Sequence, residues 1–428
     1  MMLYSRLTTA LLCGAVLLSL AACSDPGGVG TDVGREPLSG GTPSEKSVFA
    51  SPTSDTTEIS TTGLDGSDQS WRFLTGRVAD DWAGTLKTNG YVDLGGTEGS
   101  NPFDADTPAS SLNATLRLVP TYRHGDTTAT LNVELYDLQS SVDMDGASAN
   151  ESFATTGGII QSYSIDPADF SAPLDQNTVV LDLPQSWIDA NKNTLISDGD
   201  INGFKLTPTG GNSIIVGFEH GSATLRVTTD SDTVDFGVQQ SFTHIEQVAD
   251  PTTTPAANQQ LLLDGVGRGL AFNWTDSDEF AALTESVAIN RAQIQASFDT
   301  DLYNNTPTDF VRPAPSDYRI LAARRSGGPG CGALNLFTEN DQTCVFPMAT
   351  GLGAETARSD RGFTFDTFDR WFSDGRPLDA FRIEIADREQ VPSSPEGTTR
   401  RGLPSTIPAI INLDKPDGVR LTLTVTQL

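Results

Sequence analysis

Short apolar stretches that alternate residue by residue with polar ones constrain the fold of this chain from Trp71 onward. In residues 112–118 the leucines and the alanine fall on one face and polar residues on the other, as a half-buried strand requires. The same pattern recurs at residues 131–135, 179–183, 204–206 and 223–227. Gly, Asn, Asp and Pro separate these stretches, and almost none has a helical period. The sequence therefore predicts an all-β fold built of antiparallel β-sandwiches.

The second half of the chain repeats the strand order of the first half. The matched elements are the strands at residues 114–118 and 292–296, Asp182 with Trp187 and Asp366 with Trp371, Phe204 and Phe381, and the strands at residues 223–227 and 419–425. Four matches in one order predict two tandem, jelly-roll-like domains. The alternative is that any two sandwiches share such strands, because alternation is a weak signature.

The first 23 residues carry an export signal. Residues 1–6 form a short, positively charged start. Residues 7–20 form an apolar run with the length of a signal-peptide core rather than of a membrane-spanning helix. The sequence Leu-Ala-Ala-Cys at residues 20–23 resembles the lipobox of bacterial lipoproteins, which implies acylation of Cys23 and cleavage just before it. We therefore expect a lipid-anchored protein of the bacterial cell envelope, at the outer membrane. The alternative is an ordinary signal peptide with an incidental cysteine.

Composition divides the rest of the chain. Residues 24–68 are rich in Gly, Ser, Thr, Pro and acids, which favours a flexible tether, and proline and threonine near residue 251 suit a linker. The expected organisation is a signal peptide (residues 1–22), a lipidated flexible tether (23–69), a first β-sandwich domain (70–246), a linker (247–259) and a second β-sandwich domain (260–428).

The net charge of −29 limits the partners. A chain this acidic is not expected to bind nucleic acid, whose phosphates would repel it. Its 41 Asp against 15 Glu, and 22 Arg against 5 Lys, resemble the composition of proteins from salt-loving organisms. The alternatives are an acidic secreted protein of ordinary habitat, or a set of calcium-binding loops.

Two cysteines remain in the folded body, Cys331 and Cys344. They lie in one Gly-rich segment of an exported chain, so we expect a disulfide, which would contribute on the order of 3 kcal/mol. A catalytic cysteine is the rival interpretation, but none of the three histidines lies in a recognisable motif.

One loop has the spacing of a calcium site. Asp198, Asp200 and Asn202 place oxygen ligands at alternate positions ahead of Gly203. The twelfth position of such a loop is Thr209, where a bidentate Glu would be expected, so a turn between strands is the alternative. Calcium is the one cofactor that the sequence suggests.

Carboxylates beside tryptophans are the other candidates. Asp182 with Trp187, and Asp366 with Trp371, suit either sugar binding or a capped turn with a buried aromatic. A glycosidase would need two carboxylates facing one cleft, and their separation does not follow from sequence. No serine nucleophile motif, paired zinc histidines or nucleotide loop is present in the sequence.

Several short strand signatures carry a family resemblance. They are residues 114–118, 122–126, 203–206, 263–267 and 290–292, together with the lipobox. They resemble an uncharacterised family of Bacteroidetes lipoproteins, classed as a domain of unknown function, and the order of strands with Asp182 and Trp187 is similar to DNRLRE-type sandwich domains of microbial surface proteins. The resemblance implies a surface β-protein and brings no catalytic residues.

The expected function is therefore that of a non-enzymatic surface lipoprotein, held to the membrane by its lipid and binding a glycan, an envelope component or a partner protein. The alternatives are a polysaccharide-acting hydrolase that uses a carboxylate pair, and a calcium-stabilised adhesin.

Overall fold

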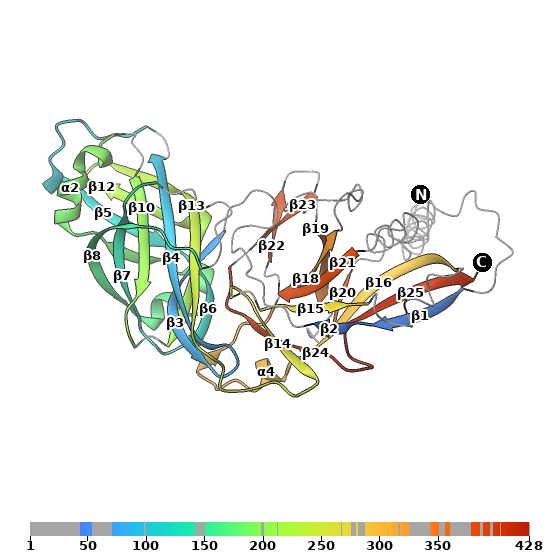
Figure 1. Cartoon of the computed structure of the whole chain (residues 1–428). Helices are drawn as coiled ribbons and strands as arrows, with labels where there is room; N and C mark the ends of the chain where they lie inside the picture. The colour runs from blue at the N-terminus through green and yellow to red at the C-terminus, as the bar shows by residue number, and fades with distance from the viewer. Residues whose placement is uncertain are drawn as a thin grey trace, which may run out of the picture.

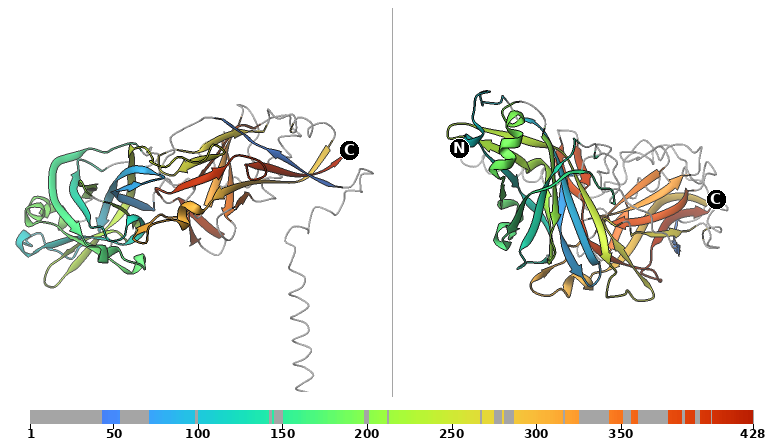
Figure 2. Two further views of the ribbon diagram at one scale, coloured as in Figure 1. Left: turned by 90° about the horizontal axis from the view of Figure 1, so that it is seen from below. Right: turned by 60° about the vertical axis from the view of Figure 1, so that its left-hand side comes forward.

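The computed structural model consists mainly of antiparallel strands in two large sheets that follow one another along the long axis of the molecule (Figures 1 and 2). The structure describes residues 43–53, 71–97, 100–141, 144, 150–197, 201–211, 213–266, 268–274, 280, 287–315, 317–324, 343–350, 356–359, 378–385, 388–393, 397–402 and 404–427. The prediction of a mainly β, antiparallel fold is confirmed.

The first sheet has 12 strands in the order β17-β6-β11-β3-β4-β13-β12-β5-β9, and β10, β7 and β8 branch from β4. Eleven of them come from the first half of the chain: β3 (Arg72–Asp80), β4 (Gly84–Thr97), β5 (Asn113–Leu118), β6 (Pro120–Asp126), β7 (Leu131–Leu138), β8 (Thr155–Ile165), β9 (Val179–Asp182), β10 (Ile201–Pro208), β11 (Ile214–Glu219), β12 (Thr224–Thr228) and β13 (Thr233–Ala249). The twelfth, β17 (Phe310–Val311), comes from the second half. This sheet curves around a core of its own, in which Val92, Phe204 and Phe236 are fully buried.

Strand β4 forks the first sheet. Its residues 84–88 pair with β3 and its residues 90–94 pair with β10, while β13 pairs along its other edge. Because side chains alternate along a strand, Val92 and Leu94 face the core and the odd-numbered residues from Lys87 to Asp93 lie on the opposite face, where Tyr91 is buried in a second, small apolar cluster. The fork therefore leaves one face turned away from the main core, the outward face, shared by β10, β4 and β13.

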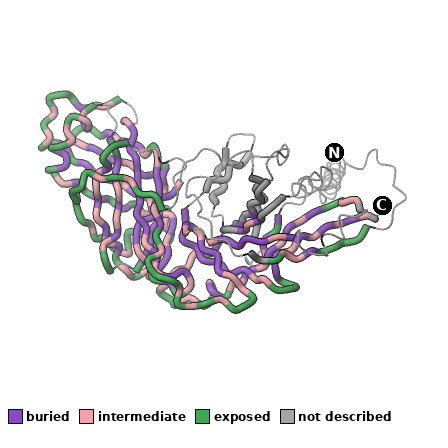
Figure 3. Tube along the Cα trace, viewed as in Figure 1, coloured by how far each residue is buried: buried purple, intermediate pink, exposed green. Residues whose placement is uncertain are grey.

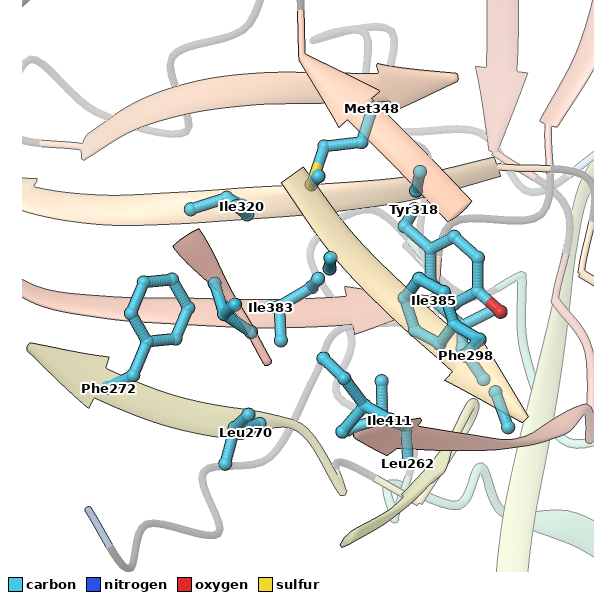
Figure 4. Close-up of a cluster of buried hydrophobic side chains, with 14 of the residues drawn as sticks. Leu262, Leu270, Phe272, Phe298, Tyr318, Ile320, Met348, Ile383, Ile385 and Ile411 are labelled. Atoms are coloured by element: carbon cyan, nitrogen blue, oxygen red, sulfur yellow. The ribbon is translucent and has the colours of Figure 1, made fainter. Parts of the chain in front are cut away.

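The second sheet has 11 strands, in the order β1-β25-β16-β20-β19-β18-β21-β15-β2 with β14 and β24 joined through β16. They are β1 (Ser44–Phe49), β2 (Ser51–Thr53), β14 (Gln259–Leu263), β15 (Leu270–Asn273), β16 (Val287–Asp299), β18 (Asp317–Arg324), β19 (Thr343–Thr350), β20 (Thr356–Ser359), β21 (Leu378–Ile385), β24 (Pro408–Asn412) and β25 (Arg420–Gln427); β22 (Arg388–Ser393) and β23 (Gly397–Gly402) form a separate pair. Figure 4 shows part of the buried cluster of the second sheet, in which Phe298 stacks on Tyr318.

Some strand pairs of the first sheet can be set beside strand pairs of the second sheet. In the first sheet β5 pairs with β12 and β9, and β7 pairs with β10 and β8. In the second sheet β16 pairs with β25 and β20, and β18 pairs with β21 and β19. Ala114 lies opposite Val227 in β12, and Ala292 lies opposite Leu423 in β25.

The segment predicted as a flexible tether contains two strands, which corrects the prediction for residues 44–53. β1 pairs with β25 and β2 pairs with β15, so these two strands stand at the two ends of the strand order of the second sheet. Val48 is fully buried in the core there. β13 of the first sheet likewise pairs with two strands in succession, first with β12 and then with β4. The hydrophobic burial of Val48 and the backbone ladder overcome the polar composition that suggested a tether.

The two sheets share one buried apolar cluster, and a strand from the second half of the chain joins the first sheet. A single apolar cluster contains Leu74, Val78 and Ile215 of the first sheet together with residues of the second, among them Leu263 and Ile407. Strand β17 pairs with β6. Figure 3 shows buried segments running through both sheets. In the predicted linker, β13 continues to residue 249 before the chain reaches β14.

One helix of the first half was not foreseen. Helix α2 (Gln185–Leu195) follows Pro184, whose extended backbone forms its N-cap, and buries Trp187, Ile188 and Leu195. The other helical elements are short: η1 (Ala109–Ser111), η2 (Pro167–Phe170), η3 (Leu174–Gln176), η4 (His220–Ser222) and α4 (Asp301–Asn304). Within the described ranges, no helix is long and apolar enough to cross a membrane.

Candidate functional site

A buried chain of polar side chains connects the two halves of the molecule. Asp80 at the end of β3 accepts hydrogen bonds from His124 Nε2 at 3.0 Å and from Arg312 Nε at 2.8 Å. The side chains of Asp80 and His124 are 0% exposed and that of Arg312 is 6% exposed. Arg312 follows β17 and also donates to the carbonyl oxygen of Leu302. A charged group of the second half is thus neutralised by a carboxylate of the first half.

The series of hydrogen bonds continues through the hydroxyl of Thr406 in the second half. Thr406 Oγ1 lies 2.9 Å from His124 Nδ1 and 3.0 Å from the hydroxyl oxygen of Tyr122. The backbone N–H of Thr406 donates to that same tyrosine hydroxyl at 3.1 Å. Beside it, the hydroxyl of Ser405 donates to the carboxylate of Asp264. We call Asp80, Tyr122, His124, Arg312 and Thr406 the junction network.

Local chemistry places Asp80 at this point. Its Oδ1 accepts from the backbone N–H groups of Trp82 and Ala83, at 2.7 and 3.0 Å, and so closes the turn between β3 and β4. Its Oδ2 then faces His124 and Arg312. Burial raises the pKa of Asp80, but hydrogen bonds and electrostatic attraction from His124 and Arg312 outweigh it and hold the pKa well below its ordinary value.

The order hydroxyl, imidazole and carboxylate is that of a nucleophile with its general base. Here Thr406 and His124 are both 0% exposed, so a substrate cannot reach the hydroxyl. A buried ion pair with every partner satisfied instead fixes the relative position of the elements that supply it. We therefore interpret the junction network as a structural joint.

Trp187 and Asp182, the tryptophan and the carboxylate singled out in the first half, do not form one site. Trp187 is only 5% exposed, packs against Phe204 and donates its indole N–H to Asp137 at 2.7 Å. Asp182 is exposed, and its backbone oxygen accepts from the hydroxyl of Tyr163. Trp187 is thus a core residue and not a stacking platform for a sugar, which was the alternative interpretation.

The predicted calcium loop is described only at its end. Asn202 lies in β10 and donates from Nδ2 to the carbonyl of Gln139 at 3.4 Å. Gly203 follows at a bulge with φ +90°, and a Cβ there would come within 2.0 Å of the Val92 oxygen. Asp198 and Asp200 lie outside the described residues. In the ranges that the structure covers, no group of three or more His, Cys, Asp or Glu side chains could hold a metal ion.

The remaining predicted residues fall where the structure gives no side-chain description. Cys23, Cys331, Asp366 and Trp371 lie outside the described residues, and only the backbone of Cys344 is placed, in β19 opposite Ala322. The disulfide and the lipidation site stay predictions.

Sequence reasoning missed the junction network. Its members come from four separate segments, and Asp80 is 44 positions from His124 while Thr406 is 282 positions away from it. The available signal was the scarcity of histidine, with three in the whole chain. Compared with known proteins, the chain matches no family model and no curated sequence.

Proposed function

We propose that this chain is a lipid-anchored binding protein of the bacterial cell envelope, non-enzymatic and attached at the outer membrane through Cys23, with its second sheet next to the anchor. The observation that carries the proposal is the pairing of β1 with β25. Ser44 lies opposite Val425, at the end of the second sheet where the chain terminates (Figure 1). A lipid on Cys23 therefore holds the molecule by that end.

The first sheet then becomes the displayed part. Residues 24–43 separate the acylated cysteine from β1, and 20 fully extended residues reach at most about 70 Å. The first sheet lies at the other end of the long axis (Figure 2). We expect it to carry the surface that binds a glycan, an envelope component or a partner protein.

The junction network supports display by a single body. Asp80 and Arg312 form a buried ion pair between the first sheet and the segment after β17. Because separating them would leave two unpaired buried charges, the first sheet cannot swing freely on the anchored sheet. A ligand bound far from the membrane would thus be held at a defined position.

We also infer that the two sheets are tandem copies of one jelly-roll-like sandwich. The support is the set of matching pairs, β5 with β12 and β9 against β16 with β25 and β20. In the second copy β1 and β2 take the place that β13 has in the first. The N-terminal segment is then both the connection to the anchor and the closing strand of the anchored copy.

Acylation tests the anchor directly. The chain with its signal is expressed in a Gram-negative bacterium grown with a clickable palmitate analogue, beside Cys23→Ala and, as a matched control, Cys13→Ala. The wild type and Cys13→Ala should be labelled and fractionate with membranes, and Cys23→Ala should be neither. An unlabelled wild type, or label retained by Cys23→Ala, would refute the proposed anchor.

A further inference from the structure

The outward face at the fork of the first sheet gathers basic side chains in a strongly acidic chain. Lys205 of β10 lies opposite Tyr91 of β4, and Asn89 of β4 lies opposite His244 of β13. Lys87 occupies the next outward position of β4. Two of the five lysines and one of the three histidines of the whole sequence thus meet on one face.

These positive groups are close enough to affect one another. Burial lowers the pKa of Lys205, and the charge of Lys87 lowers it further. Burial likewise lowers the pKa of His244, with Glu246 raising it and both lysines lowering it. Within the described part of the chain neither lysine forms an ion pair, although Glu246 stands opposite Lys87. Two neighbouring ammonium groups that no carboxylate binds among the described residues are a site where an anion would be stabilised.

Unpaired polar atoms lie beside the lysines. Asn89 is 4% exposed and contacts His244 Nδ1 through Nδ2 at 3.0 Å, while its Oδ1 has no partner among the described residues. The buried hydroxyl of Thr207 is likewise without one. Thr207 comes one position after the last pair of β10 and β4, Leu206 opposite Gly90, and is on the same face as Lys205. Leaving such atoms unpaired costs their desolvation, which a ligand would recover.

The Asn89 amide can present donors to an anion. Its oxygen and nitrogen are assigned from the hydrogen-bond network, so the amide can be turned with Oδ1 accepting from an N–H of His244. Its NH2 group then joins the Thr207 hydroxyl and the two ammonium groups. These four groups are then all donors, which is what a carboxylate or sulfate oxygen requires. Glu134 lies opposite Thr207 in β7, and its carboxylate accepts from the hydroxyl of Tyr136 at 2.7 Å.

Packing under the site holds one lysine in place. Lys205 Nζ lies 5.4 Å from the ring centroid of Tyr91, whose side chain is 0% exposed. Phe153 meets that ring edge-on at a centroid distance of 5.3 Å, and Phe242 packs at 5.9 Å. A cation fixed over a buried aromatic ring loses less conformational entropy when a ligand binds.

We propose that Lys87, Asn89, Lys205 and Thr207 bind a single carboxylate or sulfate group of an acidic glycan. This inference rests on the proposed binding function and names its ligand class. With a net charge of −29, the rest of the chain repels a densely charged polyanion. A glycan with one charged group per sugar unit instead brings one anion to two lysines and leaves its hydroxyls for the neighbouring polar atoms.

Calorimetric titration of residues 24–428 tests the site. The probes are a galacturonic acid trisaccharide, the neutral galactose trisaccharide and inorganic sulfate. The acidic trisaccharide should bind, the neutral one should not, and Lys87→Gln and Lys205→Gln should each weaken binding by about tenfold or more. Lys192→Gln in α2 is the matched control and should stay within about twofold, because that lysine lies on a separate element.

Three outcomes would overturn the inference. They are equal binding of the acidic and neutral trisaccharides, unchanged binding by both lysine variants, and no binding of either acidic probe. Binding of sulfate alone would overturn the assignment to a glycan. Melting temperatures within about 2 °C of wild type show that the variants are folded. Acylation of Cys23 is measured separately, so a failure at the lysines leaves the proposed anchor standing.

Discussion

The two sheets have some strand pairings in common but take their strands from the chain differently. Apart from the two residues of β17, the first sheet takes all its strands from residues 72–249, and β13 closes it. In the second sheet the last strand in sequence is β25. The strands at the two ends of its strand order, β1 and β2, precede the whole first sheet in sequence. The comparison teaches that an open sheet edge is filled by the segment that supplies both a ladder and an apolar side chain, and proximity in sequence does not decide it.

A charge buried beneath β1 should have the largest effect of the changes considered for the two sheets. Val48→Asp places a carboxylate in the shared core, where Val48 is fully buried. We expect the free energy of unfolding to fall by more than about 4 kcal/mol, because an unpaired buried charge is among the most destabilising changes known. Urea denaturation followed by tryptophan fluorescence measures it.

The matched control for Val48 is its neighbour on the other face of β1. Ser47→Asp introduces the same side chain at an exposed position, so the free energy of unfolding should change by no more than about 0.5 kcal/mol. If both variants unfold at the wild-type urea concentration, β1 does not complete the second sheet.

Removing the carboxylate charge of Asp80 should make the two sheets unfold in separate transitions. Asp80→Asn leaves the guanidinium of Arg312 buried without its carboxylate, at a cost of about 3–5 kcal/mol. Asp235→Asn is the control, because its pair with Arg226 is partly exposed and is worth about 1 kcal/mol or less. Calorimetry should show two transitions for Asp80→Asn where the wild type shows one. Equal melting temperatures for both variants would contradict the joint.

Acid should remove the same contribution from the wild type. The pKa of Asp80 is held below its unfolded value, so its stabilisation is complete above pH about 4 and is lost as the pH falls toward the folded pKa. The stability difference between wild type and Asp80→Asn should therefore be constant from pH 5 to 7 and shrink below about pH 4. Urea midpoints at each pH measure it, and a difference that does not shrink would show that Asp80 is not the group that titrates.

How far the sequence predicted the fold depends on where each signal lies. The strand at 113–118 follows from its own alternation, because a period of two is written within six residues. Strand β1 was missed because only Val48 and Phe49 are apolar in it, and its partner β25 lies at the other end of the chain. Helix α2 was missed because it is short and mostly polar, with only three buried residues.

The sites divide in the same way. Asp198, Asp200 and Asn202 were proposed from local spacing, and Asn202 turned out to belong to β10 ahead of a bulge. The junction network and the lysines of the fork depend on which strands meet, and neither spacing nor composition records that. Sequence-local patterns therefore predicted strands, whereas both groups of polar residues needed the topology.

The smallest expected effect sharpens the role of a single hydroxyl at the joint. Thr406→Val keeps the shape of the side chain but removes the contacts with His124 and Tyr122, each worth about 1 kcal/mol net. We expect a loss of about 1–2 kcal/mol in one transition, because the Asp80 pair with Arg312 still joins the sheets. Tyr122→Phe should cost at least as much as Thr406→Val, since it removes the contacts of the tyrosine hydroxyl with both Oγ1 and the backbone N–H of Thr406 and leaves that N–H without its acceptor. A double mutant that costs the sum of the two would show independent contacts, and a smaller cost would show that the hydroxyls act as one chain from the first sheet to the second.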